Sequence, residues 1–262
     1  MSDVLNWPML GITLAVFAFM CAANELGYRV GMAFDSEEPE PSRTIANAIK
    51  GSIIGLVAFL LGFAFSISSG RHDLRRQVVL DEANAIGTLH LRAGLLSPPE
   101  QSRIRLALTR YVAARLEYFD RGPSEASAPA LRKDMESQLV EVWAAVEAAK
   151  ARDPTVVLVS QVVPAANAVI DLNTTRGWAF RSHTPVVVLG VLLVCVFVSA
   201  GLIGHSFGQY RRRHVLLCLA FNLLFSLTLY TILDFDGPRY GLIQVDHAPL
   251  VELRSGLGAT PD

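Results

Sequence analysis

Four long stretches without a charged side chain constrain this chain more than any other feature of its sequence. They are residues 8–23, 51–69, 184–204 and 215–233. About 20 helical residues, rising 1.5 Å each, are needed to cross a hydrocarbon core of about 30 Å. The first stretch becomes long enough when its uncharged neighbours at 5–7 and Asn24 are included. The alternative, four buried helices of a soluble protein, would need a very large core around each helix, so we predict four membrane spans.

Composition agrees with a membrane protein and argues against other classes. Apolar residues make up 52% of the chain and charged residues only 18%, which is unusual for a soluble domain. The net charge of −1 argues against a nucleic-acid binder. The first stretch is preceded by Asp3 and by no Lys or Arg, so we interpret it as a retained span and not as a signal peptide. Cys21, Cys195 and Cys218 all fall inside apolar stretches, where they predict neither a disulfide framework nor a zinc site.

The polar region between the second and third spans, residues 71–183, predicts a helical extramembrane domain. Only Gly70 separates the second span from a pattern of apolar residues at three- and four-residue steps, so the span is expected to continue as a helix beyond the membrane. Ser97 and Glu100 form a capping-box pattern that predicts the start of the next helix.

Two more helices are predicted in the second half of that domain. The segment 122–129 is the clearest loop, and a helix is expected over 130–152. Asp153 and Pro154 mark the start of a last helix, in which Pro164 predicts a kink or a break because proline removes a backbone donor. The expected fold is an all-α membrane protein: hairpins at 1–70 and 184–233, a helical domain at 71–183, and a C-terminal tail at 234–262.

Three segments in this order resemble the bestrophin-like family of bacterial membrane proteins. They are RHDLRRQVVLDEANAIGTLHLRAGLL at 71–96, RYVAARLEYF at 110–119 and LDFDGPRYGLIQVDHAPLVEL at 233–253. The resemblance spans nearly the whole chain. It implies a multi-pass membrane protein with a distant likeness to bestrophins, which are pentameric anion channels.

The second span carries small and hydroxyl residues on one helical face, broken by aromatic rings. Such a stripe can line a pore with a hydrophobic constriction at Phe59 or Phe63. Small residues such as Gly51 and Gly55, or Gly204 and Gly208 near the third span, equally predict close helix packing. The two interpretations are compatible if the packing is between subunits. The pore-lining candidates are Ser52, Gly55, Phe59, Gly62, Phe63 and Ser66.

Other polar residues have a functional and a structural interpretation. Asp81, Glu82, Asn84 and His90 either form a site near a pore mouth or make hydrogen-bonded contacts between domain helices, and we favour the contacts. Asn222 and Ser226 either coordinate a permeant ion or, as we favour, form hydrogen bonds between spans.

Asp234 and Asp236 follow the last span and fail the EF-hand pattern, because the later acidic ligands of that loop are missing. Bestrophins bind calcium through an acidic clasp, so the resemblance makes these two aspartates weak candidates for cation binding. The alternative is that they end the span at the interface, and no metal is predicted as a resident group.

Two functions from different classes follow. The first is a homo-oligomeric channel or pore for small inorganic ions, and the second is a membrane-anchored sensor or scaffold whose helical domain binds a partner. No Ser-His-Asp set, phosphate loop or zinc-protease motif is present, so neither an enzyme nor a cofactor is predicted.

The expected partners are the lipid bilayer and further copies of the chain, and the expected location is the bacterial inner membrane. Arginines in the short connections place these connections in the cytoplasm and the helical domain outside. The likeness to bestrophins implies the opposite orientation, and we favour the charge count.

Overall fold

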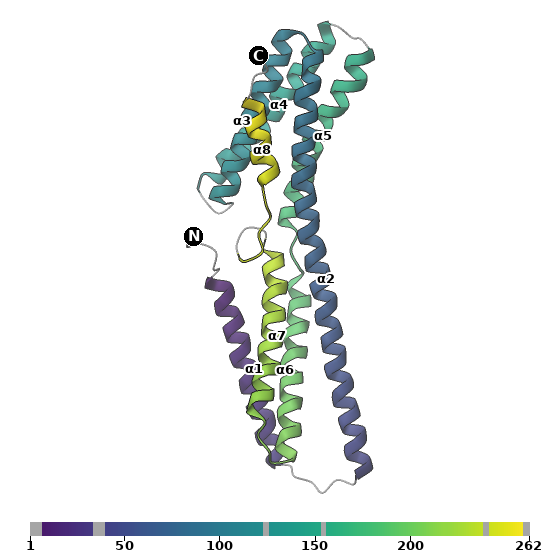
Figure 1. Cartoon of the computed structure of the whole chain (residues 1–262), viewed down its shortest axis with the longest axis vertical. Coiled ribbons are helices and arrows are strands. Elements are labelled where there is room, and N and C mark those ends of the chain that lie inside the picture. Colours follow the sequence, from purple (N-terminus) through teal and green to yellow (C-terminus); the bar gives the residue numbers. More distant parts are fainter. Residues whose placement is uncertain (1–6, 34–39, 123–125, 153–155, 238–240, 259–262) are drawn as a thin grey trace. The chain divides into compact units, whose positions relative to one another are not determined.

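The computed structural model describes residues 7–33, 40–122, 126–152, 156–237 and 241–258, and this part of the chain forms helices without a β-strand (Figure 1). The helices are α1 (Trp7–Ala33), α2 (Glu40–Arg92), the short 3-10 helix η1 (Ala93–Leu95), α3 (Pro98–Arg121), α4 (Ala128–Arg152), α5 (Val156–Arg181), α6 (Val186–Gln209), α7 (Val215–Asp236) and α8 (Ala248–Gly258). Four helices in this part are long and apolar enough to cross a membrane. The expectation of an all-α chain with such helices is confirmed.

The chain divides into two compact units, each with its own core. The first unit, the apolar unit, comprises Met1–His72 and His183–Gln244. The second, the helical unit, comprises Asp73–Ser182 and Val245–Asp262. Helix α2 therefore contributes its first part to the apolar unit and its last part to the helical unit.

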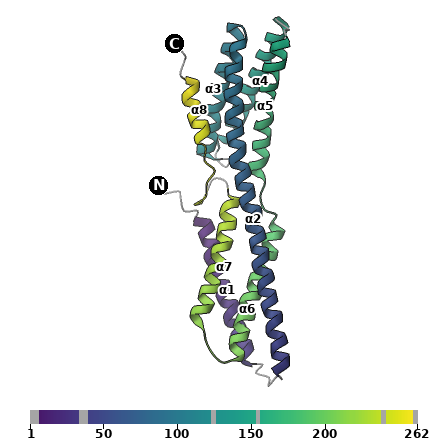
Figure 2. The same cartoon turned by 45° about the vertical axis from the view of Figure 1, so that its right-hand side comes forward.

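The core of the apolar unit takes side chains from α1, α2, α6 and α7. Met20, Val57, Val196 and Ile232, one from each helix, are all nearly inaccessible to solvent. Helices α1, α6 and α7 lie side by side in both views (Figures 1 and 2). The closest pair in this unit is α1 with α6, which belong to the two different predicted hairpins.

Glycines allow the backbones of α1 and α6 to touch. A Cβ atom added to Gly204 would lie 1.9 Å from the carbonyl oxygen of Asn24, and one added to Gly208 would lie 2.2 Å from that of Tyr28. The residue numbers of the touching positions rise together, from Asn24 with Gly204 to Tyr28 with Gly208, so the two helices run parallel. The packing role expected for Gly204 and Gly208 is thus confirmed. Gly51, by contrast, has no neighbouring atom within 4 Å of such a Cβ.

The helical unit is built from the end of α2 with α3, α4, α5 and α8. Ile86, Leu108, Val142 and Val169 represent the four longer helices in its core. Helix α8 packs on α3 and contributes Leu250, which is fully buried. The segment expected to be a C-terminal tail therefore adds a helix to this unit.

The local signals in this region have mixed outcomes. Helix α2 continues without interruption from the apolar unit to Arg92, as expected. Ser97 is the N-cap of α3, but its hydroxyl bonds the Glu100 carboxylate and no backbone N–H, unlike a full capping box. Helix α5 continues through Pro164, so the possible break is absent. The predicted helix start at Asp153 and Pro154 lies outside the described residues.

Candidate functional site

The predicted pore-lining residues all lie on the face of α2 that points away from the core of its own unit. Phe59 is 68% exposed and Phe63 is 59% exposed, whereas Val57, Leu61 and Ala64 on the opposite face are buried. The four small members, Ser52, Gly55, Gly62 and Ser66, are exposed as well. We call these four residues, together with Phe59 and Phe63, the outward stripe of α2.

The outward stripe is free of contacts from the described part of the apolar unit at its glycines. A Cβ added to Gly55 or to Gly62 would meet no atom within 4 Å. The hydroxyl of Ser52 donates to the carbonyl oxygen of Ala48, 2.9 Å away, within the same helix. Within the described residues this face has no helix packed on its glycines, so pore lining or small-residue packing here would each require another copy of the chain.

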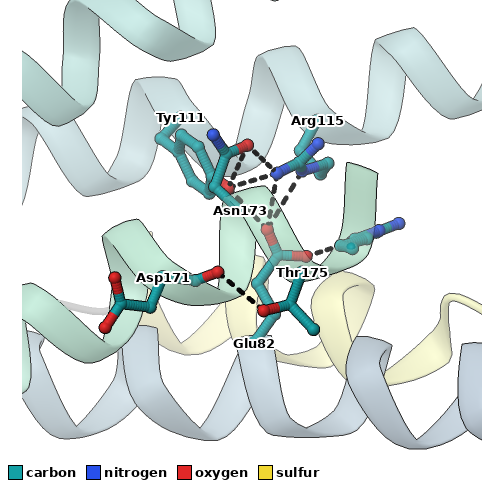
Figure 3. Close-up of polar contacts among 7 residues, drawn as sticks. Glu82, Tyr111, Arg115, Asp171, Asn173 and Thr175 are labelled. Atoms are coloured by element: carbon teal, nitrogen blue, oxygen red, sulfur yellow. Dashed lines mark hydrogen bonds and ion pairs between the residues drawn. The ribbon is translucent and has the colours of Figure 1, made fainter. Parts of the chain in front are cut away.

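A buried polar cluster lies inside the helical unit, centred on the carboxylate of Glu82 (Figure 3). The Tyr111 hydroxyl donates to Oε1 of Glu82 over 2.5 Å, and Arg115 donates to the same oxygen through Nε and Nη2 at 3.1 and 2.8 Å. Nη1 of Arg176 donates to the other oxygen, Oε2. Arg115 also donates to the Asn173 side-chain oxygen. One carboxylate thus links α2, α3 and α5.

The electrostatics of this cluster, called the Glu82 cluster below, follow from its burial. The Glu82 side chain is 0% exposed, and those of Arg115 and Arg176 are 7% and 5% exposed. Burial raises the pKa of Tyr111, and the negative charge of Glu82 raises this pKa further. Tyr111 therefore stays a neutral donor. Burial lowers the pKa of Arg115, but the Glu82 carboxylate and Tyr111 outweigh it, and the net direction is upward.

The other members of the predicted extramembrane motif do not join Glu82. Asp81 accepts a bond from Gln77, one turn earlier on the same helix. Asn84 is exposed and His90 is half-buried. Within the described residues, Glu82 is the one member of the four with a hydrogen bond to another domain helix, because its side chain is buried in the unit whereas the other three are not.

The partners of Glu82 were not singled out as site residues from the sequence. Tyr111 and Arg115 lie four residues apart within the apolar face of α3. Arg115 among apolar neighbours could have indicated the site, since a buried guanidinium needs an anionic partner. Asn173 and Arg176 carry no such signal, because α5 has no clear polar face to set them apart.

Asp234 and Asp236 are used by the chain's own backbone in the apolar unit. The Asp234 carboxylate accepts the N–H groups of Leu242 and Ile243, at 2.8 to 3.1 Å. Gly241 has φ +116°, and a Cβ there would lie 1.7 Å from Oδ1 of Asp234, so only glycine fits this turn.

The Asp236 carboxylate joins the end of α7 to Thr184, which lies just before α6. The contacts of Asp234 and Asp236 are together called the junction below. The Asp236 carboxylate accepts the N–H and the hydroxyl of Thr184 at 2.9 to 3.1 Å. Nη1 of Arg71 lies 3.6 Å from the same carboxylate and donates to the Thr184 hydroxyl. No group of three or more metal-binding side chains occurs among the residues that the structure describes. Both aspartates therefore have structural partners that do not involve a cation.

Asn222 and Ser226, in the fourth apolar stretch, contact sulfur atoms of α1. Nδ2 of Asn222 donates to Sγ of Cys21 over 3.4 Å, and Oγ of Ser226 donates to Sδ of Met20 over 3.7 Å. Both are hydrogen bonds between helices, as favoured from the sequence.

Comparison with known proteins adds the family. The model of the bestrophin-like domain matches residues 15–250. No curated protein and no solved structure gives a match. The match includes the outward stripe of α2, the Glu82 cluster and the junction at Asp234 and Asp236. The chain belongs to the bestrophin-like domain family.

Proposed function

We propose that this protein is a homo-oligomeric ion channel of the membrane in which the outward stripe of α2 lines the conducting path. The observation that carries the proposal is the division of α2 into two faces. Val57, Leu61 and Ala64 are buried in the chain's own core, whereas Ser52, Ser66 and the glycines between them are exposed. Membership in the bestrophin-like family supports the same class, since bestrophins conduct anions.

Small residues are a poor choice for a lipid-facing surface, which favours a subunit interface or a lumen at this face. Glycine and serine offer little apolar area to lipid, but they allow backbones to approach and leave space along an axis. The two exposed phenylalanines would narrow such a path, and apolar rings of this kind gate by excluding water. We therefore assign Phe59 and Phe63 to the constriction.

The membrane arrangement is part of the proposal. Helices α1, α6 and α7 and the first part of α2 cross the bilayer, and the short connections between spans face the cytoplasm by the positive-inside rule. The helical unit then faces the extracytoplasmic side of a bacterial inner membrane.

Ion flux in liposomes tests the proposal directly. The protein is compared with the double variant Phe59→Ala, Phe63→Ala and with Leu14→Ala, a control on α1 that is also exposed, at 64%. The double variant should change the flux at least several-fold, while the control leaves it unchanged. Absence of flux in every preparation, from a chain whose mass corresponds to one or two copies, contradicts the channel.

A membrane-anchored sensor or scaffold is the second candidate, and one observation favours it. Leu91 and Leu95 lie one turn apart outside the apolar stretch and are 76% and 57% exposed. Exposed leucines of this kind suit a protein partner. This second candidate is supported if flux is absent and if the double variant Leu91→Ser, Leu95→Ser loses binding of a protein partner without a change in melting temperature.

A further inference from the structure

A cavity of about 180 Å³ lies in the apolar unit, where α1 and the start of α7 meet the end of α6. Its walls include Leu219, Val215 and Phe207, and its polar groups include the side chains of Asn24 and Asn222. Two thiols, Cys21 and Cys218, also line it. Ligand sites commonly combine apolar walls with a few polar groups that fix orientation, as this cavity does.

The volume limits the size of an occupant. A cavity of about 150 Å³ with apolar walls accommodates a benzene ring. A space of about 180 Å³ therefore accepts one six-membered ring with one or two substituents, and it excludes a whole lipid or a nucleotide.

The charges around the cavity argue for a neutral occupant. The only carboxylate in the lining, Glu25, accepts from Nε of Arg29 at 2.9 Å and from both terminal nitrogens of Arg213 at 3.0 and 3.3 Å. Glu25 is thus already neutralised and offers little to a cation. The cation of the lining, Arg213, is held by this carboxylate and by the ring of Tyr28, whose centroid is 4.4 Å from the guanidinium carbon. An anion would need further donors, but Asn24 donates to the Ala200 carbonyl oxygen and Asn222 donates to Cys21.

Asn222 shows which hydrogen bond an occupant should make. The residue is 1% exposed, and its Oδ1 has no hydrogen-bond partner in the described part of the chain. A buried acceptor left in this state costs about 1–3 kcal/mol. Polar side chains within the membrane region are correspondingly uncommon and tend to mark functional positions. Oδ1 is itself covered, so a ligand that donates an O–H or N–H bonds it after a rotation of the amide toward the cavity, and this bond removes the cost.

We propose that this cavity is a binding site for a neutral single-ring molecule that carries a hydroxyl or amino donor, such as a phenol or a quinol head group. The ring packs against Leu219 and Phe207, and its donor bonds Oδ1 of Asn222. The site is independent of the outward stripe of α2, so it stands whether or not the protein conducts ions.

The two thiols of the cavity report its occupancy. Alkylation by N-ethylmaleimide is followed by mass spectrometry in the full-length protein, first with phenol and then with anisole, which has the same ring but no donor. Phenol should slow the alkylation of Cys21 and Cys218 several-fold and leave Cys195 unchanged, because Cys195 does not line the cavity. One hydrogen bond should make phenol about five- to tenfold more effective than anisole.

Three variants define the site. Asn222→Leu should remove the preference for phenol over anisole, and Leu219→Trp should remove protection by both compounds by filling the cavity. Ser226→Ala, one turn from Asn222 but outside the lining, should behave as the unchanged protein. The phenol-dependent rise in melting temperature is measured in parallel and should follow the same pattern, which keeps the test decisive if a variant folds poorly or a thiol does not react.

Equal effects of phenol and anisole, or no effect of either compound on alkylation and melting temperature, overturn the proposal. Protection that survives Asn222→Leu overturns it as well. The source of the head group is separated by comparing hydroquinone with a quinol that carries an isoprenoid tail, in lipid nanodiscs. A lower half-saturating concentration for the tailed compound assigns a membrane quinol, and equal concentrations assign a soluble phenol.

Discussion

Replacing Glu82 by glutamine should destabilise the helical unit more than any other single change of one side-chain atom. The substitution keeps the volume of the side chain but removes the negative charge that faces Arg115 and Arg176. Both guanidinium groups are less than a tenth exposed, so water cannot replace the lost partner. Removing one partner of such a buried pair costs about 3–5 kcal/mol, a large part of the 5–15 kcal/mol that stabilises a whole domain.

Amide hydrogen exchange in lipid nanodiscs measures this cost in the full chain. A loss of 3 kcal/mol corresponds to at least about a hundredfold fall in protection, since each 1.4 kcal/mol is a factor of ten. The fall should affect α3 and α5, which Glu82 joins to α2, and should leave α1 and α6 of the apolar unit unchanged.

Asp81→Asn is the matched control, because the neighbouring carboxylate bonds only Gln77 on its own helix. Its effect should stay within about 0.5 kcal/mol. A triple replacement of Glu82, Arg115 and Arg176 by methionine should recover much of the stability lost by the single change, because no buried charge is left unpaired. Equal protection in Glu82→Gln and Asp81→Asn would refute the assigned role of the cluster.

Three further predictions concern two glycines that touch a neighbouring group and one hydrogen bond that depends on pH. Gly204→Leu should separate α1 from α6 and lower the melting temperature by several degrees, whereas Gly190→Leu on the same helix, where a Cβ meets open space, should have little effect. Gly241→Ala should destabilise the apolar unit by at least about 1 kcal/mol, since φ there is +116° and the Cβ would collide with a carboxylate, and thermal unfolding measures this loss. The Ser97 hydroxyl lowers the pKa of Glu100 in the folded protein. This contact therefore adds stability at neutral pH, and the added stability is lost as the pH falls below the ordinary pKa of about 4.5 and through the lower pKa of the folded state. Between pH 7 and pH 3, Ser97→Ala should lose less of its free energy of unfolding than the unchanged protein.

Much of the fold can be predicted from the sequence because apolar length and helical periodicity are local properties. The long apolar stretches, the continuation of α2 beyond its apolar stretch and the N-cap at Ser97 all follow from neighbouring residues. Whether α5 continues through Pro164 cannot be predicted in this way, because packing in the helical unit decides whether the helix tolerates the missing backbone donor. The pairing of α1 with α6 also escapes, since it depends on glycines far apart in the sequence.

The candidate sites divide in the same way. Glu82 can be singled out from the sequence as a contact, but its partners on α3 and α5 come from positions 29 to 94 residues away. The cavity beside Asn222 was missed entirely, because it depends on how α1, α6 and α7 meet. A polar side chain among apolar neighbours indicates that a hydrogen-bond partner is needed, but the sequence does not identify that partner.

Polar residues whose partners lie within the chain should affect stability, whereas exposed residues of the outward stripe should affect function. Glu82, Asp234 and Asp236 accept hydrogen bonds from their own chain, so their replacement should lower stability and change activity only through the amount of folded protein. The outward stripe of α2 packs on little of its own unit, and Phe59→Ala should therefore leave the melting temperature nearly unchanged. A variant that alters flux at unchanged stability would point to the stripe, whereas loss of flux in proportion to folded protein would point to the internal clusters. Measuring both quantities on the same preparation assigns each residue to one class.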